Sequence, residues 1–203
     1  MERSERHVYN LDESGLSKLI QLNSSIKAHG GLTMNESKEL QLRLKNKWEF
    51  VCKGVNGQTK WREVADNLIV NVGLQDLLTK YLKGSSYTAA WYVGIKEAGT
   101  AVAADTMASH SSWTENVDYT ESVRQTLTLG TATTADPSSV DNSSNKATFS
   151  INDTATIAGA FMVTDSTKSG TSGTLYGVVD FGSTRSVISG DTLEITVTLT
   201  SGN

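Results

Sequence analysis

The sequence predicts a mainly β protein, an antiparallel β-sandwich or jelly-roll-like domain that follows an N-terminal arm with a helical part and an extended strand. From Trp91 onward, short apolar runs of period two alternate with turns rich in Gly, Ser, Thr and Asp, which is typical of antiparallel sheets. Helical periodicity is confined to two stretches nearer the N-terminus. We therefore assign residues 1–37 to a helical arm and residues 38–203 to a β-rich sandwich domain with one helix at about 68–83.

The first element expected is a helix in "LDESGLSKLIQLNSSIKAHGG". Asp12 is a suitable N-cap, and a pair of glycines that begins at Gly30 ends the pattern. Leu16, Leu19 and Ile20 share one face at i, i+3, i+4 spacing. Two interpretations stay open: an ordinary helix that packs on a core, or a terminal element that docks on a partner.

The stretch "KELQLRLKNKWEFVCKG" predicts one long strand from Lys38 to Lys53. Charged or polar residues fill nearly all odd positions, whereas only Asn46 interrupts the apolar even ones. This alternation puts the apolar groups on one face of a strand, so the single cysteine should be buried and unreactive. The backbone edge of such a strand could also pair with a neighbouring molecule. The apolar even positions are Leu40, Leu42, Leu44, Trp48, Phe50 and Cys52.

A hairpin and the second helix are expected next. Asn56-Gly57 is a two-residue hairpin signal that requires positive φ at both positions, and the return strand should run from Gln58 to Val64. The spacing then changes to a helical period from Leu68, and Gly84 ends that helix.

The remaining elements are strands whose alternation assigns side chains to faces. In "TAAWYVGI", Trp91 should lie in the core and Tyr92 on the opposite side, although an aromatic pair that stacks on a ligand is the alternative. Each further run should share one face within itself: Val123, Leu127 and Leu129; Ala147, Phe149 and Ile151; Ile157, Gly159, Phe161 and Val163; Leu193, Ile195, Val197 and Leu199.

Composition excludes several classes of function. The net charge of −4 combines 14 basic and 11 acidic residues in 1–100 with 4 basic and 11 acidic residues in 101–203. The acidic half should repel nucleic acid, and the basic half has no concentrated basic patch. No apolar run is long enough for a membrane span, no signal-peptide pattern begins the chain, and one cysteine allows no internal disulfide. We expect synthesis in the cytoplasm, with neither nucleic acid nor membrane as a partner.

No pattern of catalytic, cofactor-binding or metal-binding residues is evident. The three histidines lack the spacing of a metal site. "DTMASHSSW" holds Asp105 and His110 beside two serines, but a catalytic triad is defined by geometry and no G-x-S-x-G is present. The acidic loops lack an ordered calcium-binding series, so turn formation explains them better; their carboxylates are Asp136, Asp141, Asp153 and Asp165.

The order of several segments resembles a family of small virion proteins of tailed bacteriophages. These segments are "WEFVCKGVNGQTKWREVADNLIVNVGL", "TAAWYVGI", "DTMASHSSWTE", "YTESVRQ", "NKATFSIN", "ATIAGAFMVTD" and "SGDTLEITVTL", and they span about Trp48 to Thr200. The resemblance implies a non-enzymatic capsid decoration (cement) protein that forms homo-oligomers and binds the major capsid protein or another virion protein. A tail or head-fibre attachment protein is the alternative. The expected partner contacts in the arm and strand are Leu16, Leu19, Ile20, Leu40, Leu42 and Leu44.

Overall fold

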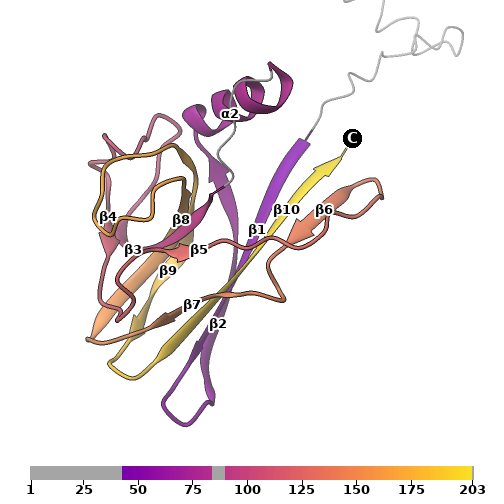
Figure 1. Ribbon diagram of the computed structural model, residues 1–203. Helices are drawn as coiled ribbons and strands as arrows, with labels where there is room; N and C mark the ends of the chain where they lie inside the picture. Colours follow the sequence, from indigo (N-terminus) through magenta and orange to yellow (C-terminus); the bar gives the residue numbers. More distant parts are fainter. Residues whose placement is uncertain (1–42, 84–89, 203) are drawn as a thin grey trace, which may run out of the picture. The chain divides into compact units, whose positions relative to one another are not determined.

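Antiparallel strands dominate the computed structural model, which describes residues 43–83 and 90–202 (Figure 1). The chain separates into two units, 1–40 and 41–203, and the described residues belong to the second. The elements are β1 (Arg43–Lys53), β2 (Thr59–Ile69), α2 (Asn71–Leu77), η1 (Leu78–Leu82), β3 (Tyr92–Gly99), β4 (Trp113–Asn116), β5 (Gln125–Thr126), β6 (Ser138–Asp141), β7 (Ala147–Ser150), β8 (Ala155–Val163), β9 (Leu175–Val187) and β10 (Thr192–Gly202).

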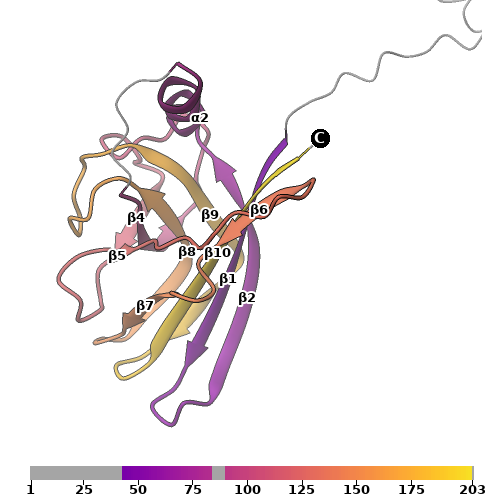
Figure 2. The same cartoon turned by 45° about the vertical axis from the view of Figure 1, so that its right-hand side comes forward.

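The ten strands form one continuous antiparallel sheet that curls into a half-barrel (Figure 2). The strand order is β4-β3-β8-β9-β2-β1-β10-β6, with β5 beside β3 and β7 beside β10. Segments from opposite ends of this order meet, because the Thr120 amide donates to the Ser150 carbonyl over 2.9 Å and Tyr119 bridges to Ile151. The predicted mainly β, antiparallel sandwich-like class is confirmed for the described residues.

β1 is an inner strand of the sheet, and this corrects the expectation that its edge is available to a neighbouring molecule. It pairs with β10 from Arg43 to Lys53 on one side and with β2 on the other. β2 covers residues 47–53, so both edges of that part of β1 are occupied within the chain, and the expected pairing with a neighbouring molecule is wrong for residues 47–53. The predicted burial of the even positions is confirmed for Trp48, Phe50 and Cys52, which have no exposed surface.

The predicted partner contacts fall mostly outside the described residues. This holds for Leu16, Leu19, Ile20, Leu40 and Leu42, and also for the helix expected after Asp12. Leu44 lies on β1 opposite Ser201 of β10 and is half-buried.

The hairpin after β1 differs in detail from the expected two-residue turn. Its loop has three residues: the Gly57 amide donates to the Gly54 carbonyl over 2.8 Å, and the Gly54 amide donates to the Gln58 carbonyl over 3.0 Å. Only Gly57 has positive φ, at 76°, and Asn56 does not. This is the geometry of a type I turn followed by a glycine in the left-handed region. The Asn56-Gly57 dipeptide is compatible with this turn as well as with the expected two-residue turn.

The return strand is longer than predicted and the helix begins later. β2 continues to Ile69, so Leu68 lies in a strand, opposite Val178 of β9. The helix starts at Asn71. Sequence periodicity placed the start of the helix too early. Leu68 and Val72 are four residues apart, which fits one helix, but Leu68 belongs to the end of β2 and Val72 to the start of α2.

Two apolar clusters lie on the two faces of the sheet. The larger one fills the inner face of the half-barrel with side chains from β1, β3, β7, β8, β9 and β10. The smaller one lies on the other face of β3, β8 and β9 and includes Trp113, Phe161 and Val178. The predicted alternation in β10 is confirmed, since Leu193, Ile195 and Val197 all belong to the larger cluster.

Two of the predicted face assignments are wrong. The pairing of β8 with β9 shifts between Ile157 and Gly159, so Ile157 shares the inner face with Met162, whereas Phe161 lies on the other face. Between the Ile157 and Gly159 pairs, β8 advances two residues and β9 advances five, and period-two counting does not detect such an irregularity in the register. Val123 is exposed and only Gln125–Thr126 pairs as β5, so "SVRQTLTLG" is mostly an extended loop.

A buried ion pair fixes the loops beside the smaller cluster. The Arg124 guanidinium, which has no exposed surface, donates from Nε and Nη2 to the two oxygens of Glu115 over 2.9 and 2.7 Å. It also donates to the carbonyls of Asp165 and Gly170 over 3.0 and 2.9 Å. One side chain therefore joins β4 to the loop between β8 and β9.

Candidate functional site

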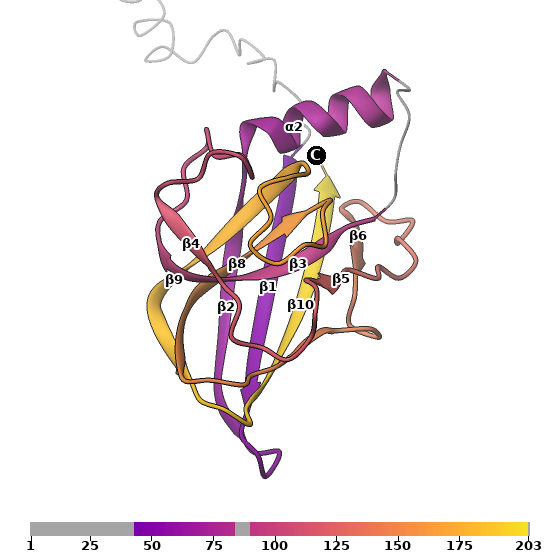
Figure 3. The same cartoon turned by 60° about the vertical axis from the view of Figure 1, so that its left-hand side comes forward.

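A short helix lies across one end of the half-barrel, at the end opposite the tip of the β1–β2 hairpin (Figure 3). Its first residues are held firmly: the Val70 amide donates to the Tyr176 carbonyl over 3.2 Å and the Asn71 amide to the Ala103 carbonyl over 2.8 Å. Gly73 lies directly on β9, where a Cβ atom would stand 2.2 Å from the Tyr176 carbonyl oxygen. Glycine is thus required for this close approach of helix and strand.

The second half of the helix is wider and less supported. The Lys83 amide donates to the Leu78 carbonyl over 3.0 Å, which is the i to i+5 pattern of a π-turn, and such turns are frequent at functional sites. Gly73 is the buried residue of α2. Further along, Leu77 is half-buried, whereas Leu74, Leu78 and Tyr81 are exposed.

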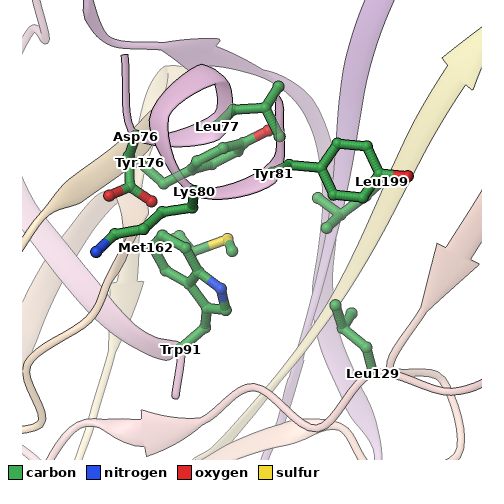
Figure 4. A pocket seen from close by; sticks show the side chains of 9 residues that line it. All are labelled: Asp76, Leu77, Lys80, Tyr81, Trp91, Leu129, Met162, Tyr176 and Leu199. Atoms are coloured by element: carbon green, nitrogen blue, oxygen red, sulfur yellow. The ribbon is translucent and has the colours of Figure 1, made fainter. Parts of the chain in front are cut away.

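An apolar cleft of about 430 Å³ opens between this helix and the strand ends (Figure 4). We call it the mouth cleft. The helix provides one wall, and residues adjoining or within β3, β5, β8, β9 and β10 provide the other. Its lining is Asp76, Leu77, Lys80, Tyr81, Trp91, Leu129, Met162, Tyr176 and Leu199.

The mouth cleft continues the main core outward. Trp91 and Tyr176 form an edge-to-face pair with ring centroids 5.5 Å apart, and both pack against the larger apolar cluster, as do Leu129 and Leu199. Aromatic and aliphatic groups thus make up most of the lining, with one acidic and one basic side chain. A cleft of this size and composition suits apolar side chains of a partner and offers few hydrogen-bonding groups to a sugar.

Trp91 lies between the larger apolar cluster and the mouth cleft. It faces the larger cluster with Val93 and Ile95, while Tyr92 packs against the smaller one, so the predicted alternation is confirmed. Trp91 is half-buried rather than fully enclosed, however, because its outer surface lines the mouth cleft. Trp91 thus packs against the core on one side and lines the cleft on the other, and stacking of the aromatic pair on a ligand stays a prediction.

The helix also carries exposed apolar side chains. Leu74, Leu78 and Tyr81 are 42, 56 and 81% exposed, and we call these three residues the helix ridge. Tyr81 belongs to the ridge and also borders the mouth cleft. Adjacent exposed apolar residues of this kind, next to an apolar hollow, are typical of interaction surfaces.

A second hollow, of about 420 Å³, lies along the helix and is more polar. It shares Asp76 and Lys80 with the mouth cleft, and its other lining residues are Val72, Gln75, Thr79, Thr106, Gly173, Thr174 and Leu175. Because these hollows lie along the helix, the hydrogen bonds of Val70 and Asn71 and the contact of Gly73 with β9 are the main interactions that position it.

Two polar side chains lie at or near the mouth cleft: Tyr176 is half-buried and Asn46 is buried. Burial raises the pKa of Tyr176, and the neighbouring Asn46 side chain acts in the opposite direction. Asn46 lies opposite Leu199 in the β1–β10 pair and is 4% exposed, and its Nδ2 has no hydrogen-bond partner among the described residues. Asn46, which interrupts the apolar even positions of β1, thus lies next to Leu199 of the cleft lining.

The residues considered for nucleophilic catalysis do not form a triad. Asp105 Oδ2 accepts hydrogen bonds from Trp113 Nε1 over 3.0 Å and from the Val102 amide over 2.8 Å. The His110 ring stacks on Trp113, with centroids 3.9 Å apart, and its Nδ1 lies 3.2 Å from the Trp113 carbonyl oxygen. These groups organise a loop around one tryptophan.

The acidic loops use their carboxylates for turn formation. Asp141, Asp153 and Asp165 each accept a hydrogen bond from a backbone amide one or two residues later. Within 43–83 and 90–202, no group of three or more possible metal-ligating side chains lies together. No helix in these ranges is long and apolar enough to cross a membrane.

Cys52 is a core residue. Burial, followed by the charge of the nearby Asp191, raises the pKa of its thiol to about 12. The thiol lies 3.7 Å from Asp191 Oδ2, whose carboxylate also pairs with Lys60. A protonated, enclosed thiol is a poor nucleophile, as the alternation predicted.

Sequence reasoning missed the mouth cleft. Leu74, Leu77, Leu78 and Tyr81 follow the i, i+3, i+4, i+7 spacing of a single buried stripe, so the helix pattern carried no mark of a cleft. The strand residues of the cleft carry no such mark, because burial and rim positions have the same period.

No family model, no curated protein and no solved structure matches the chain.

Proposed function

We propose that this chain is a non-enzymatic structural protein of a tailed-bacteriophage virion that works by binding other proteins. The observation that carries the binding role is the helix ridge beside the mouth cleft. Apolar groups held at the surface by a strand framework are suited to association, since their burial on contact is the main favourable term.

The use of the polar residues supports a structural role. Arg124 and Glu115 join loops, and Asp105 holds Trp113. Lys96 is fully buried, pairs with Asp180 and donates to the Gly99 carbonyl. These charged groups are engaged in stabilising the sheet and its loops.

The virion setting rests on the resemblance in segment order, and two placements follow from it. In the first, the protein decorates the outer surface of the capsid, binds the major capsid protein and stabilises the shell. In the second, it is a tail or head-fibre adaptor. We favour the first, because an antiparallel framework without evident chemistry fits a component that acts in many copies.

The test is the copy number in purified particles from cells that carry the gene. Quantitative mass spectrometry against the major capsid protein should give hundreds of copies per particle for a decoration protein. A dozen or fewer copies would support the adaptor instead. Absence of the protein from particles would overturn the virion proposal altogether.

A further inference from the structure

We propose that the helix ridge and the mouth cleft form a twofold-symmetric dimer contact, in which the ridge of one copy enters the cleft of a second copy and receives the same in return. The inference rests on the proposed binding role and names its first partner as the chain itself. It concerns one surface, made of residues from α2, η1 and the strand ends.

First, the surface carries the helix ridge and the mouth cleft, and both are mainly apolar. Leu78 and Tyr81 project, with more than half of each side chain exposed. The adjoining cleft of about 430 Å³ is lined mainly by apolar groups such as Trp91 and Leu129. Tyr81 belongs to both features, because it is a ridge residue that also borders the cleft (Figure 4).

The second step is symmetry. A twofold contact uses the same patch on both copies, so that residue i meets residue j while j meets i. A surface with an apolar ridge beside an apolar hollow meets this requirement, since one association buries both ridges and both clefts.

The third step is charge. Asp76 and Lys80 border the cleft and have opposite signs. Two copies that approach through this face therefore bring together equal numbers of positive and negative charges from these positions. Like charges across an interface oppose association, and this pair imposes no such net repulsion.

The composition of the cleft disfavours a glycan as its ligand. A glycan requires several directional hydrogen bonds, whereas aliphatic and aromatic groups form most of the lining. The π-turn in η1 adds to the argument, because it widens the helix at the point where Leu78 and Tyr81 project.

The experiment is sedimentation velocity of the full chain over a range of concentrations. We expect a concentration-dependent dimer that Leu78→Glu and Tyr81→Glu each weaken at least about 30-fold, the effect expected for residues at the centre of an interface. Leu129→Trp, which fills the cleft, should weaken it as well. The control is Val55→Glu, at a hairpin-tip position that is 74% exposed, and it should leave dimerisation unchanged. Circular dichroism confirms that each variant is folded.

A mixing experiment distinguishes insertion of the ridge into the cleft from general stickiness of the helix. Leu78→Glu keeps an intact cleft and Leu129→Trp keeps an intact ridge, so an equimolar mixture restores one of the two contacts. The mixture should therefore contain heterodimers at a concentration where either variant alone is monomeric. Failure of the mixture to dimerise would overturn the ridge-in-cleft arrangement.

Three further results would overturn the proposal: a full chain that stays monomeric at its highest soluble concentration, a dimer that persists in Leu78→Glu, or a dimer that disappears only when residues 1–37 are deleted. Failure of the dimer is distinguishable from failure of the proposed function. Particle copy number tests the virion role, whereas sedimentation tests the dimer, and either result can stand without the other.

Discussion

Replacement of Arg124 by methionine should strongly destabilise the protein. The substitution removes two hydrogen bonds to Glu115 and two to backbone carbonyls, and it leaves a carboxylate whose side chain is only 6% exposed. Removal of one partner from a buried ion pair typically costs about 3–5 kcal/mol, because the remaining charge stays desolvated. This is a large part of the roughly 5–15 kcal/mol that stabilises a typical domain.

The expected shift in Tm follows from the size of the protein. For chains of roughly 150–250 residues, each kcal/mol changes Tm by about 2–4 °C, so Arg124→Met should lower Tm by about 6–20 °C. Differential scanning calorimetry measures the shift, and urea unfolding gives the free-energy change independently.

The control is the double variant Arg124→Met/Glu115→Leu. Since it removes both charges, it should be more stable than Arg124→Met alone, although the two backbone carbonyls still lack their donors. A single variant that loses less than about 1 kcal/mol, or a double variant whose loss equals the sum of the two single losses, would show that the pair is not the stabilising contact described.

Three other perturbations test separate parts of the structure. Gly73→Ala, which normally stabilises a helix by nearly 1 kcal/mol, should destabilise this one because the new methyl group meets the Tyr176 carbonyl; a Tm equal to or above that of the wild type would contradict the close approach. Cys52, with its pKa raised to about 12, should react with a thiol reagent at pH 8 only as fast as the protein unfolds, and rapid labelling of native protein would refute its burial. Two lysines hold the pKa of Glu194 below its ordinary value of 4.5, so its stabilising contribution is present above that pH and is lost as pH falls through the lowered pKa. Glu194→Gln should therefore reduce the loss of stability on acidification, as measured by urea unfolding at pH 7 and pH 3.5.

Period-two alternation predicted most of the framework from the sequence. It correctly gave the buried face of β1, the faces of β10, and the opposite orientations of Trp91 and Tyr92. It failed in β8, because a bulge changes the register without leaving a mark in composition. The start of the helix was also misplaced, since Leu68 fits the period of a strand as well as that of a helix.

The candidate site was beyond sequence reasoning for a different reason. The mouth cleft joins a helix to residues near the ends of five strands, and the strand order that brings them together depends on long-range pairing. Leu199 and Leu129, for example, approach Tyr81 only once the sheet has curled. Local patterns define which face of a strand is apolar, but they do not define which part of that face lies at the rim.

The pairing of Arg43 with Gly202 has a practical consequence for engineering. The described chain enters and leaves at the same end of the sheet, and the two antiparallel strands then run together for 11 residues. At about 3.4 Å per residue, the loop at Val55–Gly57 lies roughly 40 Å from that end. Foreign peptides inserted between Asn56 and Gly57 should therefore be displayed far from the helix and its cleft. A force applied between Arg43 and Gly202 would separate β1 from β10 one pair at a time from one end, so these strands should come apart at low force.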